Sequence, residues 1–173
     1  MRRTLIGLVL LSAAGCSGNK DSKIPGDELG TYQVVAQLDS STCGPGALGS
    51  KDLWEFEVKL SQDGRDLYWL NGSEPVAGSL ASDGVSFGFD SHTVVTPIPA
   101  GKGHPGCAIA RTDSGTGKLS SAAPPVAGFD GTLRYGFQPL AGSDCAALVA
   151  VEGGFHTLPC EISYAMKASL QPE

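Results

Sequence analysis

The stretch Leu53–Leu70, LWEFEVKLSQDGRDLYWL, carries the clearest structural pattern in this sequence. Within Leu53–Leu60 apolar residues alternate with charged ones, and a period of two is typical of an antiparallel strand with one buried face. Asp63-Gly64 follows, a residue pair that is favoured in two-residue hairpin turns. The apolar run Leu67–Leu70 then predicts the returning strand, so the whole stretch predicts a β-hairpin.

Similar short segments, separated by turn residues, recur at regular spacing along the chain. The composition includes 24 glycines and 11 prolines but only 17% charged residues. It disfavours helices, because glycine costs about 1 kcal/mol in a helix interior. The other expected strands are Thr31–Leu38, Val76–Leu80, Val85–Asp90, Cys107–Thr112, Gly131–Gln138, Cys145–Glu152 and Cys160–Leu170.

The segments between these strands complete the predicted architecture. Two of them, His92–Gly106 and Asp113–Gly131, are rich in glycine and proline, and we expect long loops there. The last two strands are expected to form a hairpin around Gly153-Gly154. About nine strands in sequence order predict an all-β fold, an antiparallel up-and-down barrel, since closure removes exposed strand edges. A β-sandwich is the alternative.

The start of the first expected strand carries a resemblance. Gly30–Val34, GTYQV, resembles the Gly-x-Trp opening of lipocalin-like and avidin-like barrels, with Tyr32 in the place of the tryptophan. The resemblance implies a barrel rather than a sandwich.

The N-terminus has the three parts of a secretory signal. Arg2 and Arg3 are basic, Leu5–Leu11 is apolar, and Ser12–Gly15 consists of small residues. The apolar part spans about ten residues, whereas a membrane-spanning helix needs roughly 20. Residues 1–15 are therefore expected to be a cleaved signal peptide.

The residues at the expected cleavage point add a second resemblance. Ala13-Ala14-Gly15-Cys16 resembles the lipobox of bacterial lipoproteins, with Ala13 where that family usually carries leucine. The resemblance implies that Cys16 receives diacylglycerol and that a peptidase cuts before it. Ser17 stands where the family's inner-membrane signal has aspartate, which implies the outer membrane. The alternative is an ordinary signal peptide, with Cys16 structural or free.

The remaining chain is expected to be a tether followed by one domain. Residues 16–29 are polar and rich in breakers, as in flexible linkers. Residues 30–173 form the expected single all-β domain, which is long enough to bury roughly 70% of its extended-chain surface. The formal charge of the whole chain is −6. This charge argues against nucleic acid as a partner, because nucleic acid attracts basic surfaces.

Four cysteines remain once Cys16 is assigned to lipid, and they predict two disulfides in an oxidising compartment. Four cysteines allow three connectivities. The expected hairpin around Gly153-Gly154 places Cys145 near Cys160, which leaves Cys43 to pair with Cys107. The spacings lack Cys-x-x-Cys, so we expect neither a zinc site nor another metal or cofactor.

No combination of residues predicts catalysis. His92, His104 and His156 are expected in loops or at strand starts, and the serine-rich segments lack a Gly-x-Ser-x-Gly elbow. Glu55 and Glu57 lie on one face of one strand, whereas the paired carboxylates of glycosidases flank a cleft. We therefore expect a protein that is not an enzyme.

The large aromatic residues are the remaining candidates for a functional site. Small barrels either fill their interior with such side chains or leave room for one small ligand. Two hypotheses follow for a lipid-anchored protein of the bacterial envelope, periplasmic or surface-exposed. One is a module that binds a small apolar ligand or a partner protein, and the other is a structural or assembly lipoprotein with a filled core. The candidate ligand-binding residues are Trp69, Phe87, Phe89, Tyr135, Phe137 and Tyr164.

Overall fold

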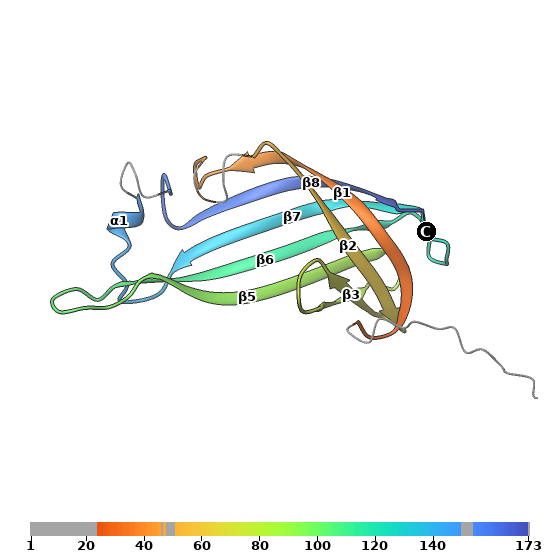
Figure 1. Ribbon diagram of the computed structural model, residues 1–173, viewed down its shortest axis with the longest axis horizontal. Coiled ribbons are helices and arrows are strands. Elements are labelled where there is room, and N and C mark those ends of the chain that lie inside the picture. Colours follow the sequence, from red (N-terminus) through yellow and green to blue (C-terminus); the bar gives the residue numbers. More distant parts are fainter. Residues whose placement is uncertain (1–23, 46, 48–50, 150–153, 173) are drawn as a thin grey trace, which may run out of the picture.

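A computed structural model describes residues 24–45, 47, 51–149 and 154–172, so the predicted signal peptide at residues 1–15 and the predicted lipidation site at Cys16 lie outside the described residues. Eight antiparallel strands form a closed barrel in sequence order (Figure 1). The predicted up-and-down barrel is therefore confirmed, and the sandwich is not formed. The strands are β1 (Asp27–Ser41), β2 (Leu53–Asp63), β3 (Asp66–Leu70), β4 (Val76–Leu80), β5 (Ser86–Ile98), β6 (Cys107–Leu119), β7 (Gly128–Pro139) and β8 (Cys160–Leu170).

The predicted hairpin is formed by β2 and β3, with its turn one residue later than expected. Asp63 pairs with Asp66, so Gly64 and Arg65 form the loop. Gly64 has a φ of +62°, and glycine at the first central position is typical of a type II′ turn. The alternation in β2 is also present, because Leu60 is fully buried while the charged residues before it lie towards solvent.

The two long loops expected from glycine and proline content are present but shorter than predicted, covering residues 99–106 and 120–127, and the rest of each predicted segment is strand. β5 continues to Ile98, β6 to Leu119, and β7 begins at Gly128. Close approach of neighbouring atoms explains several of the glycines in these strands, and at Gly117 one neighbour is an aromatic ring. A Cβ on Gly117 would lie 2.6 Å from Cζ of Phe87, so glycine here makes room for a buried ring within a regular strand.

The strand predicted at Cys145–Glu152 is wrong. Ala146–Val149 forms one helical turn, α1, where the Asp144 carboxylate accepts a hydrogen bond from the Ala146 N–H at 3.1 Å. The expected hairpin partner of β8 is thus absent from the described residues, and β8 pairs with β7 and β1. No helix in residues 24–172, as far as they are described, is long and apolar enough to cross a bilayer.

The disulfides differ from the predicted pairs. Cys43 is bonded to Cys160, with Cα atoms 5.0 Å apart, and Cys107 is bonded to Cys145, with Cα atoms 4.8 Å apart. Barrel closure explains the first bond, because the register that pairs Ser41 with Ile162 places Cys43 opposite Cys160 when it is continued.

The second disulfide follows from the segment that leaves β7. Leu140 N–H donates to Ala108 O at 2.9 Å, and Asp144 N–H donates to Gly106 O at 2.8 Å. These bonds lay the chain before α1 against the start of β6, which brings Cys145 to Cys107. Both disulfides therefore lie at one end of the barrel, which we call the disulfide end.

The opposite end of the barrel is filled by side chains. Tyr32, Leu60 and Leu67 are fully buried there. The Tyr32 hydroxyl donates to Val126 O at 3.0 Å and also lies 3.3 Å from Leu29 O. Burial raises the pKa of Tyr32 to about 12.

Replacing Tyr32 by phenylalanine is expected to destabilise the fold by about 1–2 kcal/mol at neutral pH, because the Val126 carbonyl loses its donor. The tyrosine contribution is complete below its unfolded pKa of about 10 and is lost as the pH rises through about 12, since the folded state disfavours ionisation. The stability gap between Tyr32→Phe and the parent should therefore shrink from pH 10 to 12 in urea unfolding at fixed pH. A gap that stays constant across this window would contradict the assignment.

The barrel wall has a lateral opening towards the disulfide end, because β3 and β4 are short. β3 pairs with β2 only over Lys59–Asp63, and β4 pairs with β5 only over Phe87–Phe89. Among the described residues, Leu53–Val58 of β2 and Asp90–Ile98 of β5 thus pair on one side only. Figure 1 shows β2 and β5 diverging from each other beyond β3.

Candidate ligand-binding site

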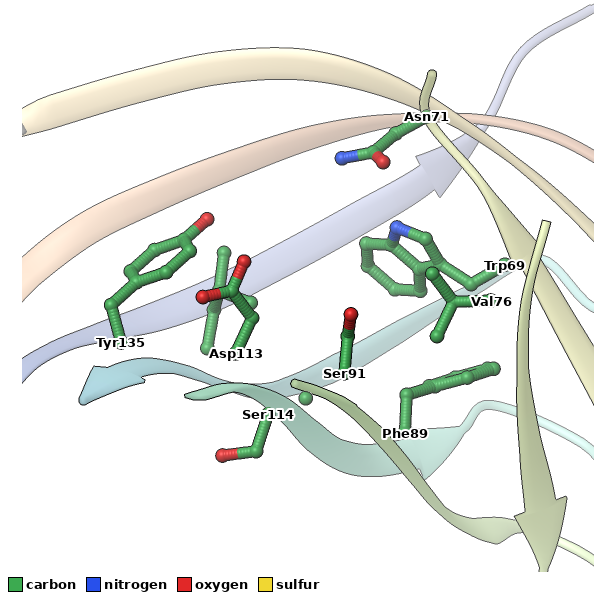
Figure 2. Close-up of a pocket in the computed structure, with 10 residues that line it drawn as sticks. Trp69, Asn71, Val76, Phe89, Ser91, Asp113, Ser114 and Tyr135 are labelled. Atoms are coloured by element: carbon green, nitrogen blue, oxygen red, sulfur yellow. The ribbon is translucent and has the colours of Figure 1, made fainter. Parts of the chain in front are cut away.

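A pocket of about 120 Å³ lies where the lateral opening begins. It is formed by side chains from β3 to β7 and by the turn after β3 (Figure 2). Its lining residues are Trp69, Asn71, Val76, Phe89, Ser91, Asp113, Ser114, Gly115, Leu133 and Tyr135.

One side of the pocket is apolar. Trp69 and Phe89 are both buried, and their rings meet edge to face with centroids 5.5 Å apart. Val76 and Leu133 complete this side. These residues occupy inward positions of their strands, so the barrel pattern itself supplies an apolar surface for a ligand.

The other side of the pocket holds a carboxylate that is fixed by an arginine. Arg111 donates from Nε to Asp113 Oδ1 at 2.6 Å and from its terminal nitrogen to Oδ2 at 2.7 Å. The Arg111 guanidinium also lies 5.1 Å from the ring centroid of Tyr135. Two charged groups on adjacent inward positions of β6 are therefore paired inside the barrel opening.

The energetic effect of this ion pair on folding is small. The Arg111 and Asp113 side chains are 35% and 32% exposed, and ion pairs in contact with solvent contribute about 0–1 kcal/mol. The geometry has a different consequence. The bidentate contact holds the Asp113 carboxylate in one orientation, and each oxygen keeps a lone pair for a further donor.

The Tyr135 hydroxyl is available as a hydrogen-bond donor at this pocket. Burial raises the pKa of its hydroxyl, and the nearby Asp113 carboxylate raises it further. The phenol therefore stays protonated throughout the physiological range.

Several polar atoms at the pocket have no partner within the described part of the chain. No hydrogen bond within this part of the chain involves the side-chain polar atoms of Trp69, Asn71, Ser91 and Tyr135. These atoms are not sealed off from solvent. In Figure 2 the Ser91 hydroxyl and the Asp113 carboxylate point into the same space, and the Asn71 amide faces them from the opposite side. Donors and acceptors thus converge on a small pocket with an apolar side.

The volume limits what the pocket can hold. An engineered apolar cavity of roughly 150 Å³ in another protein accommodates benzene. A pocket of about 120 Å³ therefore has room for one ring-sized or short branched group. A haem, a pigment or a whole fatty acid would extend out through the lateral opening.

The structure brings together three of the six predicted ligand-binding residues, namely Trp69, Phe89 and Tyr135. The other three do not line the pocket, although Phe87 packs against Phe89 and Tyr164 packs against Tyr135 behind its lining. Phe87 contacts Phe129 in the filled end, with centroids 5.5 Å apart. Phe137 packs against Phe155, and Tyr164 packs against Trp54.

The polar residues of the pocket, Asn71, Ser91 and Asp113, are absent from the sequence-based prediction, as is Arg111 behind the carboxylate. The missing signal is strand length. Arg111 and Asp113 continue the inward register of Cys107 and Ile109, and Ser91 continues that of Phe89. A longer β5 and β6 would have placed Ser91 and Asp113 inside the barrel, whereas Arg111 already lies on the inward face of the predicted strand Cys107–Thr112.

The histidines lie apart from this pocket. His92 is on β5 with its Nδ1 3.1 Å from Thr112 Oγ1. His104 lies in the turn bridged to Gly101, and the His156 N–H donates to Cys43 O at 2.7 Å. Within the described residues, no group of three or more His, Cys, Asp and Glu side chains could hold a metal ion.

Comparison with known proteins provides no family for this chain. No protein-family model, no curated protein and no solved structure matches it.

Proposed function

We propose that this chain is a non-enzymatic lipoprotein of the bacterial cell envelope whose barrel binds a small ligand at the Trp69–Asp113 pocket. The observation that carries this proposal is the convergence of partnerless polar side chains on a ring-sized pocket with an apolar side. Pockets with this combination of apolar lining and few polar anchors are typical of small-molecule sites.

The chemistry of the lining defines the ligand. Trp69 and Phe89 favour a compact apolar or ring-shaped group. The Asp113 carboxylate accepts hydrogen bonds, while the Tyr135 hydroxyl and the Asn71 amide donate them. Because Arg111 neutralises Asp113, the pocket suits a neutral molecule with hydroxyl groups better than a free cation.

The anchor and the compartment are part of the same proposal. The lipobox at Cys16 supports attachment of two or more acyl chains, which hold a protein on a bilayer without a spanning segment. The two disulfides support an oxidising compartment, as expected for the periplasm or the cell surface. Ser17 favours the outer membrane.

The filled end of the barrel supports a second candidate, the structural or assembly lipoprotein. Tyr32, Leu60 and Leu67 are fully buried and fill the interior of this half of the barrel, as expected for a barrel that acts through its outer surface. The two candidates differ in one respect, because only the first requires the pocket to take up a ligand.

Titration with ring-sized probes tests the binding function. The chain has two tryptophans, and Trp54→Phe leaves Trp69 as the single indole reporter. Benzyl alcohol should cause a saturable change in Trp69 fluorescence at millimolar concentration, and toluene should bind more weakly. Asp113→Asn keeps the shape of the side chain but removes its charge. It should weaken the binding of benzyl alcohol by about tenfold, as expected for the loss of a hydrogen bond to a charged group.

Equal responses to benzyl alcohol and toluene would show that the polar side of the pocket has no role. A flat response to both probes would favour the structural candidate.

A further inference from the structure

The edge of β2 in the lateral opening presents backbone groups that no described residue pairs. Leu38 N–H donates to Asp52 O at 2.7 Å, and this bond shows which residues of β2 direct their backbone groups towards β1. In an antiparallel ladder, backbone groups of alternate residues point to opposite sides. Even-numbered residues of β2 therefore bond to β1, whereas Leu53, Glu55 and Glu57 direct their N–H and C=O groups into the opening. We call these three residues the β2 edge.

The two faces of β2 along this edge have different chemistry. Glu55 and Glu57 are exposed on the outer face, and Leu53 beside them is 49% exposed. Trp54 and Phe56 are half-buried on the inner face, with ring centroids 4.9 Å apart. A strand added here would thus meet carboxylates on its outer side and aromatic rings on its inner side.

The position where β3 leaves β2 has space on both faces. On the outer side is a hollow of about 290 Å³ that is lined by Glu57, Leu70 and Gly72 among others. On the inner side is the ligand pocket, and Asn71 lines both cavities. Side chains on either face of an added strand would therefore have room.

We propose that the β2 edge binds an extended segment of a partner protein in which basic side chains alternate with apolar ones. Strand addition uses main-chain hydrogen bonds for affinity and alternate side chains for specificity. Opposite charges on directly facing residues stabilise a strand pair, so lysine or arginine is favoured opposite Glu55. The chain's formal charge of −6 adds a long-range attraction for a basic segment. This inference goes beyond the small-ligand site and does not depend on it.

The facing edge of β5 lacks this complementarity. Leu119 N–H donates to Val85 O at 2.9 Å, so even-numbered residues such as His92 and Val94 direct their backbone groups into the opening. Val94 is 60% exposed and no row of like charges accompanies it. The β5 edge therefore offers backbone groups without a charge pattern, and it supplies a matched control.

Hydrogen exchange of the full disulfide-bonded chain, measured by NMR, tests the proposal. The probe is a short synthetic peptide of alternating lysine and valine. Added at about ten times its dissociation constant, it should slow exchange at Leu53, Glu55 and Glu57 by about tenfold. Amides that already bond to β1, such as Phe56, should be unchanged. The same residues arranged in two blocks should give no protection at equal concentration.

Variants separate the backbone and charge contributions. Glu55→Pro removes an edge N–H and should abolish peptide binding, whereas Val94→Pro removes the equivalent group on β5 and should leave binding unchanged. Glu55→Gln should weaken binding by about two- to fivefold, as expected for an exposed ion pair. Should Glu55→Pro fail to fold, Glu55→Lys provides the same test, because it should transfer the preference to a peptide of alternating glutamate and valine.

Three results would overturn the proposal: equal protection by the block peptide, protection on β5 that Val94→Pro removes, or no protection at millimolar peptide. Benzyl alcohol binding at the pocket should be the same in Glu55→Gln and in the parent. Loss of peptide binding and loss of ligand binding are therefore distinguishable.

Discussion

Replacing Cys43 and Cys160 together by alanine is expected to lower the free energy of unfolding by about 5 kcal/mol. The bond closes a loop with a sequence separation of 117 residues, and longer loops restrict the unfolded chain more. It also joins the end of β1 to the start of β8, the two strands whose pairing closes the barrel. Urea unfolding of the oxidised proteins measures the difference.

The second disulfide is the matched comparison. Cys107–Cys145 closes a loop with a sequence separation of 38, so its removal should cost about 4 kcal/mol. A domain is typically stable by about 5–15 kcal/mol, so removing both bonds should leave the chain largely unfolded. A loss below about 1 kcal/mol for the Cys43 and Cys160 variant would contradict the importance of barrel closure.

Replacing Cys16 by serine is expected to abolish lipid attachment completely. In the lipoprotein family that residues 13–16 resemble, the sulfur of the cysteine thiol carries the diacylglycerol, and a serine hydroxyl does not replace it. Without acyl chains the protein should leave the membrane fraction, since each buried CH₂ group contributes about 0.8 kcal/mol to anchoring. Incorporation of labelled palmitate in a bacterial host measures the effect.

A second variant controls for export. Ala13→Leu restores the residue that the family usually carries, and it should keep or increase palmitate incorporation. Palmitate incorporated into Cys16→Ser, or absent from the parent chain, would show that Cys16 is not lipidated.

The barrel could be predicted because its pattern is local. Alternation in Leu53–Leu60 and the turn at Gly64 determine a hairpin without reference to the rest of the chain. The expected loop at Asp113–Gly131 is longer than the observed loop at 120–127, because glycine content alone does not distinguish a turn from a strand whose glycines make room for neighbouring atoms. Gly117 is suited to β6 because a Cβ there would lie 2.6 Å from Cζ of Phe87, a residue on another strand.

The disulfide pairing could not be predicted for a related reason. The bond between Cys43 and Cys160 depends on the register between the first and last strands, which is set by closure of the whole barrel. The predicted pair of Cys145 with Cys160 depends on a local hairpin, and α1 occupies that position.

The candidate site was predictable only in its apolar half. Trp69, Phe89 and Tyr135 are aromatic residues on strands with clear alternation, so they are expected inside. Ser91 and Asp113 are polar, and inward polar residues resemble the solvent-facing residues of a loop when the strand's length is unknown. Polar residues inside a barrel break the alternation, and here they line the candidate pocket.

The most direct test of the binding account fills the pocket. A Cβ added at Gly115 meets no atom within 4 Å, because the residue faces the pocket. A Cβ added at Gly88 also meets no atom within 4 Å, but Gly88 lies on the outer face of β5. Gly115→Leu and Gly88→Leu are therefore a matched pair. In the fluorescence titration with benzyl alcohol, Gly88→Leu should bind like the parent and Gly115→Leu should show no saturable change. Equal binding by both variants would contradict the account, since it would place the ligand outside the pocket.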